Sequence, residues 1–173
     1  MKPNLTMTLV GGLLGTPAMT ALMYVLAPAL GVNTDIVTML GEILGGWRMG
    51  MLVHILNGAV IFPAVFAFLL YRFLPGSLVA KGITFGVLLW LTSQLLVMPV
   101  MGAGFFSSHI GGLKAAVASL LGHVVYGGLL GLFPTLAQED LLGKPMLTSS
   151  LSASPRQTRT EAAVNFKAEK EAR

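Results

Sequence analysis

Residues 49–71 read MGMLVHILNGAVIFPAVFAFLLY, a stretch that contains no Asp, Glu, Lys or Arg. About 20 predominantly apolar residues are enough for a helix to cross the hydrocarbon core of a bilayer. Similar stretches lie at about residues 5–30, 83–101 and 115–136. Because lipid offers no water to pair with backbone groups, such stretches fold as helices. The sequence therefore predicts an all-α protein in which residues 1–140 form a bundle of four transmembrane helices.

The low charge of the chain argues against a compact water-soluble fold. Of its 173 residues, 54% are hydrophobic and only 10% are charged, whereas a soluble domain carries about 25% charged residues. We therefore expect the lipid bilayer to be the main partner of its surface. The chain holds no cysteine, which excludes disulfides and thiolate metal sites.

The basic residues predict how the bundle is oriented, because Lys and Arg are enriched in cytoplasmic loops. With four spans, Lys2, Arg72 and Lys81 share one side with the C-terminal segment, whereas Arg48 and Lys114 lie on the other side. The sequence therefore predicts that both ends face the cytoplasm (N-in, C-in).

The composition changes at about residue 143. Residues 143–173 combine Ser, Thr and Ala with charged residues, a composition that buries too little apolar surface to fold. The segment lacks the pattern of interleaved basic and aromatic residues that is typical of nucleic-acid binding. We expect a disordered basic cytoplasmic tail and no nucleic-acid partner.

A short amphipathic helix is predicted in the first outer loop. Residues 33–34, Asn and Thr, suit a helix N-cap, and Asp35 suits a first turn. Within residues 36–44 the apolar side chains share one helical face, which is typical of a helix lying in the membrane interface. The glycines at 45–46 end this helix, and Trp47 follows as an interfacial anchor.

Two polar motifs stand out inside the spans. The second span carries His54-Ile-Leu-Asn57-Gly58, and the fourth carries His123-Val-Val-Tyr126-Gly127. A step of three residues keeps each His on the same helical face as its polar companion. The shared pattern indicates a weak internal repeat that relates spans one and two to spans three and four. The candidate cofactor-binding residues are His54, Asn57, His123 and Tyr126.

The two histidines allow several interpretations. If the imidazoles converge, they could ligate a haem b iron or a metal ion, or hydrogen-bond a quinone or a polar headgroup. Alternatively, each His bonds a neighbouring helix and stabilises the bundle. The partners would then be Thr16 or Thr20 for His54, and Ser119 or Gln94 for His123.

Methionines provide a second candidate set of metal ligands. Met98 and Met101 share a stripe of the third span, and thioethers combined with imidazoles favour Cu(I). The candidate metal ligands are therefore His54, His123, Met98 and Met101. Methionine is also a common gap-filler in apolar cores, so core packing stays an alternative.

Glycines at four-residue spacing predict where helices approach closely. They are Gly11 and Gly15, Gly82 and Gly86, and Gly127 and Gly131.

A set of motifs resembles a known family. They are Gly12-Leu-Leu-Gly15-Thr16-Pro-Ala-Met19-Thr20, His54-x-x-Asn57-Gly58, Met98-Pro99-Val-Met101-Gly102 and Leu121-Gly122-His123-x-x-Tyr126-Gly127. Together they are similar to a family of small bacterial four-helix membrane proteins of unknown function. The likeness covers about residues 5–136. It implies a multi-pass protein of the bacterial inner membrane and supplies no activity.

Three classes of function follow from these features. The first is a structural or accessory subunit of a larger membrane complex or a homo-oligomer, favoured by small size and Gly-rich faces. The second is a b-type haem or metal protein that uses His54 and His123. The third is a binder or conduit for a lipid, a quinone or another small apolar molecule. No catalytic motif is evident, which favours a non-enzymatic role and leaves the question of an enzyme open.

Overall fold

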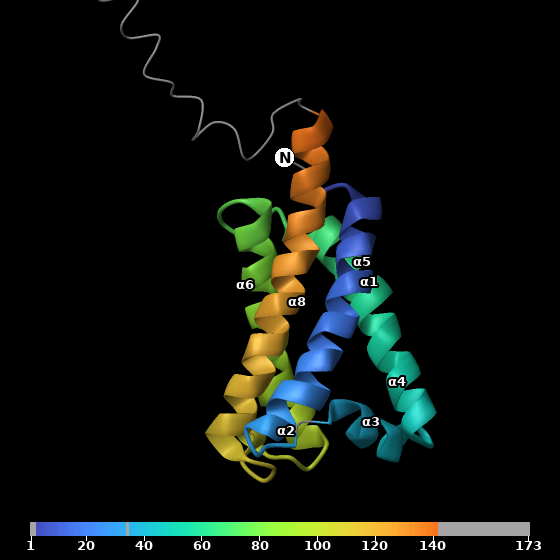
Figure 1. Cartoon of the computed structure of the whole chain (residues 1–173), viewed down its shortest axis with the longest axis vertical. Helices are drawn as coiled ribbons and strands as arrows, with labels where there is room; N and C mark the ends of the chain where they lie inside the picture. The colour runs from blue at the N-terminus through green and yellow to red at the C-terminus, as the bar shows by residue number, and fades with distance from the viewer. Residues whose placement is uncertain (1–2, 34, 142–173) are drawn as a thin grey trace, which may run out of the picture. The chain divides into compact units, whose positions relative to one another are not determined.

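The computed structural model describes residues 3–33 and 35–141, and all its regular elements are helices (Figure 1). Four long helices, each unbroken or assembled from shorter segments, are long and apolar enough to cross a membrane. They are span 1 (Leu5–Ala29), span 2 (Trp47–Leu70), span 3 (Leu78–Val100) and span 4 (Gly112–Gln138). This confirms the predicted all-α architecture with four candidate membrane spans. The predicted tail at 143–173 lies outside the described residues.

The segments of each span are as follows. Span 1 consists of α1 (Leu5–Ala21), η1 (Leu22–Leu26) and α2 (Ala27–Ala29). Span 2 consists of α4 (Trp47–Leu56), η2 (Asn57–Ile61), α5 (Phe62–Val65) and η3 (Phe66–Leu70). Span 3 consists of α6 (Leu78–Thr92), η4 (Ser93–Val97) and α7 (Met98–Val100). Span 4 lies within α8 (Gly112–Leu141), and the connections hold α3 (Ile36–Leu44) and η5 (Phe105–Ser107).

The distribution of side chains is that of a protein in lipid. The buried face of α1 consists of small residues, namely Thr8, Gly11, Gly12, Gly15 and Thr16. Leu13 and Leu14 on the same helix are 58% and 46% exposed. A soluble helix shows the reverse pattern, with large apolar residues inside, whereas membrane helices pack through small residues.

Spans 2, 3 and 4 begin earlier than their apolar stretches. Span 3 starts at Leu78 instead of residue 83, because Ser77 caps it by accepting a hydrogen bond from the Ala80 backbone N–H. Lys81 therefore lies inside the helix, and its Nζ donates to the Tyr71 carbonyl oxygen at 2.7 Å. A long Lys side chain can pack its stem on apolar surface while its charge stays at the membrane boundary.

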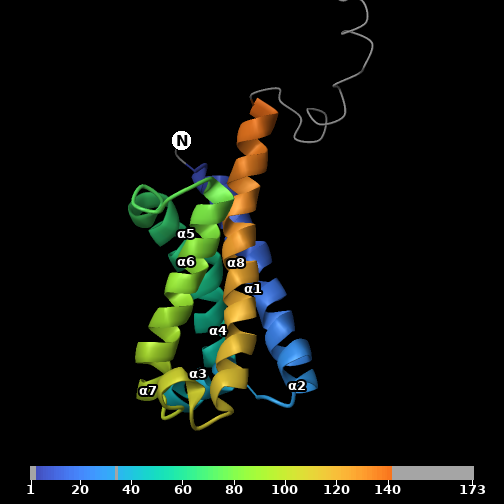
Figure 2. The ribbon, with the colours of Figure 1, turned by 90° about the vertical axis from the view of Figure 1, so that its left-hand side faces the viewer.

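The loops gather at two ends of the bundle (Figures 1 and 2). The N-terminal end of α1 and the connection between spans 2 and 3 lie at one end. The other end, here called the α3 end, holds α3, η5 and the two remaining connections. Successive spans therefore run in opposite directions, and spans 2 and 4 both start at the α3 end.

The predicted helix at 36–44 is present as α3. The N-cap is Asp35, one position later than the cap predicted at 33–34, and it accepts from the Thr38 N–H at 3.0 Å; Gly45 ends the helix at a φ of 94°. Asp35 also accepts from the Tyr24 hydroxyl at 3.0 Å, which ties α3 to span 1. Gly50 of α4 lies directly against the backbone of α3 at Val37, so α3 and α4 are packed backbone to backbone.

Spans 1, 2 and 3 contain four π-helical turns within the described residues, and a proline follows three of them by two residues; the exception is η3 in span 2. The three turns are η1, η2 and η4, and the prolines are Pro28, Pro63 and Pro99. Proline lacks an N–H and its ring crowds the carbonyl four residues earlier. A wider turn with i→i+5 bonds relieves that crowding. Two further prolines, Pro17 and Pro134, lie inside the unbroken helices α1 and α8.

Spans 1 and 3 end in the same structure. The π-turn and its proline are followed by a glycine with positive φ, Gly31 (73°) in one and Gly102 (79°) in the other. The next residue donates back to the residue before the proline, Val32 to Ala27 at 3.0 Å and Ala103 to Met98 at 2.9 Å. This likeness extends the internal repeat that the histidine motifs of spans 2 and 4 indicate.

The core away from the α3 end is compact and aromatic. Phe66, Phe85, Tyr126 and Leu130 form a buried cluster, with the two Phe rings 5.5 Å apart. The predicted glycine contacts are present here, because Gly82 lies against Gly127 and Gly131 of α8. At these positions the backbones of α6 and α8 touch, which is the geometry that small residues permit.

Candidate functional site

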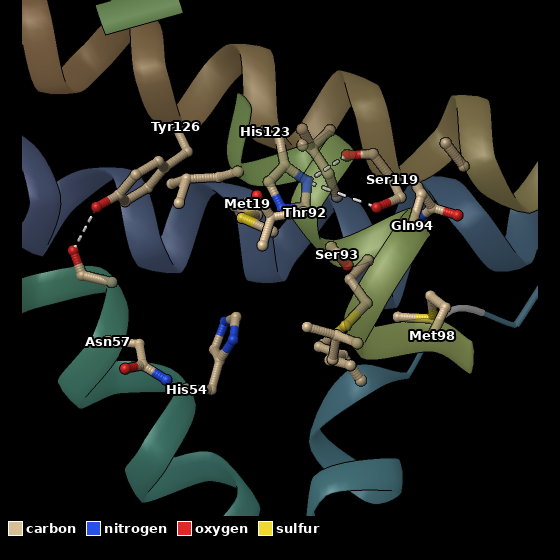
Figure 3. Close-up of a pocket in the computed structure, with 18 of the residues that line it drawn as sticks. Met19, His54, Asn57, Thr92, Ser93, Gln94, Met98, Ser119, His123 and Tyr126 are labelled. Carbon is tan, nitrogen blue, oxygen red and sulfur yellow. Dashed lines mark hydrogen bonds between the residues drawn. The ribbon is translucent and has the colours of Figure 1, made fainter. Parts of the chain in front are cut away.

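A cavity of about 290 Å³ lies toward the α3 end, walled by all four spans together with α3 and the loop after span 3 (Figure 3). The lining is mostly apolar. The polar residues of the wall are Thr16, His54, Asn57, Thr92, Ser93, Gln94, Ser107, Ser119, His123 and Tyr126. All four candidate cofactor-binding residues from the sequence therefore meet at one cavity, although they come from two different helices.

His54 reaches the cavity from α4 and is held by span 1. Its Nε2 lies 3.0 Å from the Thr20 hydroxyl, one of the two partners expected from the sequence. That hydroxyl donates its single proton to the Thr16 carbonyl oxygen at 2.7 Å, so it must accept from His54. Nε2 therefore carries the proton of the neutral imidazole, and Nδ1 keeps a free lone pair.

His123 reaches the cavity from α8 and is held by its own helix. Its Nδ1 lies 2.8 Å from the Ser119 carbonyl oxygen. A carbonyl oxygen only accepts, so Nδ1 donates and Nε2 keeps the lone pair. Figure 3 shows the two imidazoles on opposite walls, both pointing into the cavity. The site thus offers one unprotonated nitrogen from each side.

Gln94 of η4 does not bond His123, the second alternative raised by its sequence position. Its Oε1 instead accepts from the Ser107 hydroxyl at 2.9 Å. The Gln94 side chain is fully buried, and its Nε2 has no hydrogen-bond partner among the described residues. An unpaired buried amide costs about 1–3 kcal/mol. Gln94 therefore presents an unsatisfied donor in the cavity wall.

Ser107 is a site residue that sequence reasoning missed. It lies in the loop after span 3, which the apolar pattern treats as a simple connection, yet it is only 1% exposed. Its backbone φ of 57° places it in the left-handed region, as does that of Phe106 at 50°. No sequence motif marks this loop, because its position depends on how η5 folds back onto η4.

The π-turns also free backbone carbonyls in the cavity wall. In η2 the Phe62 N–H donates to Asn57, and the next candidate donor for Gly58 is Pro63, which has no N–H. The Tyr126 hydroxyl fills this role by donating to the Gly58 carbonyl oxygen at 2.7 Å. In η1 and η4 the residue five positions after Met23 and after Gln94 is likewise a proline. The Met23 and Gln94 carbonyls therefore also lack their usual helical donors.

We expect Tyr126→Phe to destabilise the protein by about 2 kcal/mol, because it leaves the buried Gly58 carbonyl without any donor. For a chain of this size the melting temperature in detergent should fall by about 4–8 °C. Tyr71→Phe is the matched control, since the Tyr71 hydroxyl has no hydrogen-bond partner in the described part of the chain. Equal melting temperatures for the two variants would contradict the assignment.

The candidate methionine ligands separate in the structure. Met98 is buried and lines the cavity, whereas Met101 does not line it and follows α7 in the turn at the α3 end. Met19 and Met23 of span 1 line the cavity in its place. Within residues 3–33 and 35–141, no group of three or more His, Cys, Asp or Glu side chains is placed to hold a metal ion.

These features define a multi-pass membrane protein with a largely apolar cavity between its spans. The chain belongs to the family of unknown function DUF6789, which matches its residues 3–141. The match covers the four spans and every residue of the cavity wall. No curated protein and no solved structure matches the chain.

Proposed function

We propose that the protein binds a small, weakly polar organic molecule between its spans, held by His54 and His123. The observation that carries the proposal is the pair of imidazole lone pairs on opposite walls of one cavity. Neither lone pair has a protein partner among the described residues. Polar groups facing an apolar cavity without partners are typical of a ligand site.

The size of the cavity favours an organic molecule over a single ion. Its volume of about 290 Å³ is near the lower end of the range of about 300–1,000 Å³ for small-molecule sites. The cavity is also much larger than a single water molecule, which occupies about 30 Å³ in the liquid. Metal ligands lie about 2.0–2.3 Å from their ion, so a site built for one ion would be far smaller.

A cofactor is the second candidate, and one observation favours it. Metal-bound histidines usually donate their other ring nitrogen to a carbonyl or carboxylate oxygen, as His123 does to Ser119. Haem b between His54 and His123, or Cu(I) with Met98 added, would use this arrangement. A reduced-minus-oxidised absorption spectrum and elemental analysis of the purified protein test both. The accessory-subunit alternative predicts larger subunits that co-purify with the chain.

We also propose an N-in, C-in orientation in a bacterial inner membrane, with α3 on the outer surface and residues 143–173 in the cytoplasm. Arg72 and Lys81 support it, since they lie at the end opposite α3 together with the N-terminal end of α1. Arg48 and Lys114 are the cations of the α3 end.

Cysteine labelling tests this orientation, because the natural chain has no cysteine. Phe73 and Leu113 are 75% and 78% exposed at opposite ends of the bundle. In intact spheroplasts, a membrane-impermeant maleimide should label Leu113→Cys and spare Phe73→Cys until the membrane is permeabilised. Labelling of Phe73→Cys in sealed spheroplasts would reverse the orientation.

Extraction of the purified protein tests the ligand. An organic molecule should co-purify with the unmodified chain in gentle detergent and appear in mass spectra of the extract. His54→Leu and His123→Leu should each lower its occupancy about tenfold, since a ligand group then loses its partner. His109→Leu is the control, because His109 bonds the Gly102 carbonyl outside the cavity. Identical extracts from all four proteins would contradict the proposal.

A further inference from the structure

We propose that the cavity is a hydroquinone site, which binds the reduced ring in preference to the oxidised quinone. This inference rests on the proposed function and names the chemical class of its ligand. It follows from which hydrogen-bonding groups face the cavity as acceptors and which as donors.

The two histidines are acceptors. Their remaining hydrogen bonds fix the protons on the far nitrogens, so His54 offers Nδ1 and His123 offers Nε2 as lone pairs. A quinone has only carbonyl oxygens, and these would face the two lone pairs without a proton between them. A hydroquinone has two O–H groups on opposite sides of its ring, and each can donate to one imidazole.

Gln94 supplies the complementary donor. Its Nε2 is fully buried in the cavity wall and unpaired among the described residues, because only its Oε1 is occupied, by Ser107. The oxygen of either ring form can accept from this amide. Gln94 therefore accounts for affinity toward both forms, whereas the histidines account for the preference between them.

The rest of the wall suits a neutral, flat and apolar ring. Apolar side chains from three spans, among them Met19, Phe62 and Leu89, surround the polar groups. Gly58 and Gly122 also belong to the wall, where the Thr16 and Met19 side chains pack against them. None of the described lining residues is Asp, Glu, Lys or Arg. A vicinal diol, as in a monoacylglycerol headgroup, has both hydroxyls on adjacent carbons, which matches two opposite walls less well.

Calorimetric titration of the full-length protein in nanodiscs tests the inference. The probes are decylubiquinol under anaerobic conditions, decylubiquinone and monoolein. We expect Kd for the reduced probe to be at least about tenfold lower than for the oxidised one, the effect of one well-placed hydrogen bond from a ring O–H to an otherwise unpaired imidazole nitrogen. This comparison uses the unmodified chain and needs no variant to fold.

The variants separate the roles of the side chains. His54→Leu and His123→Leu should each weaken the reduced probe about tenfold and leave the oxidised probe unchanged, so that the redox preference shrinks. Gln94→Leu should weaken both forms alike. His109→Leu should match the unmodified protein. A preference that persists in both His54→Leu and His123→Leu would overturn the assignment.

Failure of this inference differs from failure of the proposed function. Equal or tighter binding of the oxidised probe, or tighter binding of monoolein, overturns the hydroquinone assignment. The hydroquinone assignment is also wrong if neither redox form of the probe binds while the extract holds a molecule whose occupancy depends on the histidines. In that case the proposed function still stands. If no molecule is extracted and no probe binds, both are wrong.

Discussion

Gly127→Val should lower the melting temperature of the protein by about 6–12 °C. A Cβ at Gly127 would collide with the Gly82 carbonyl oxygen and lie 3.1 Å from the Gly86 Cα. Because these are backbone atoms, α6 and α8 must move apart, which costs about 3 kcal/mol. About 2–4 °C per kcal/mol is typical for a chain of this size, and differential scanning fluorimetry in detergent measures the shift.

The neighbouring glycine provides the control. A Cβ at Gly128 would meet nothing closer than the Ile83 Cγ1 at 3.9 Å. Gly128→Val should therefore change the melting temperature by less than about 2 °C, although it places the same side chain one residue along the same helix. If both variants shifted it equally, helix propensity rather than backbone contact would explain the effect, and the packing of α6 on α8 would be wrong.

Gly50→Val should release α3 from the bundle without unfolding the spans. A Cβ at Gly50 would collide with the Val37 carbonyl oxygen and lie 2.8 Å from the Gly41 amide nitrogen. A cost of about 2 kcal/mol would make the α3 amides exchange about thirtyfold faster. Ile36 and Leu40 of α3 line the cavity, so the molecule that we propose to bind there should also be lost during purification.

Leu52→Val controls for this change on the same helix. Leu52 is 56% exposed, on the face that we expect to contact lipid, so its truncation should leave α3 exchange unaltered. Hydrogen–deuterium exchange in nanodiscs compares the two variants peptide by peptide. Unchanged protection of α3 in Gly50→Val would show that other contacts, such as the Tyr24–Asp35 bond, hold α3 in place.

The sequence predicted the four spans and α3 because each depends on local composition. Apolar runs must become helices in lipid, and Asp35 and Gly45 bound α3 through their own chemistry. The two histidine motifs stood out in the sequence because intramembrane polar residues are rare, and His54 and His123 both line the cavity. That they line one cavity with Asn57 and Tyr126 follows from spans 2 and 4 starting at the same end.

Other features depend on contacts between distant residues, and the sequence could not supply them. Ser107 reaches Gln94 only because the η5 loop folds back, and no spacing rule links the two residues. Met101 shares a stripe with Met98 on an ideal helix, but the chain leaves helical geometry after Val100. The start of span 3 at Leu78 was missed because hydropathy marks where charges stop rather than where a cap begins.

The π-turns of spans 1, 2 and 3 have a consequence for how such a cavity can arise and be lost. Relative to an ideal α-helix, each turn accommodates one additional residue and rotates everything beyond it by about 100°. The turns η1, η2 and η4 each contribute residues to the cavity wall, whereas η3 does not. Inserting or deleting a single residue at one of these turns therefore opens or closes the cavity, because it rotates the whole part of the helix beyond the turn. If a relative lacks one of these turns and is aligned without a gap there, residues that lie on different faces of the helix are paired with each other.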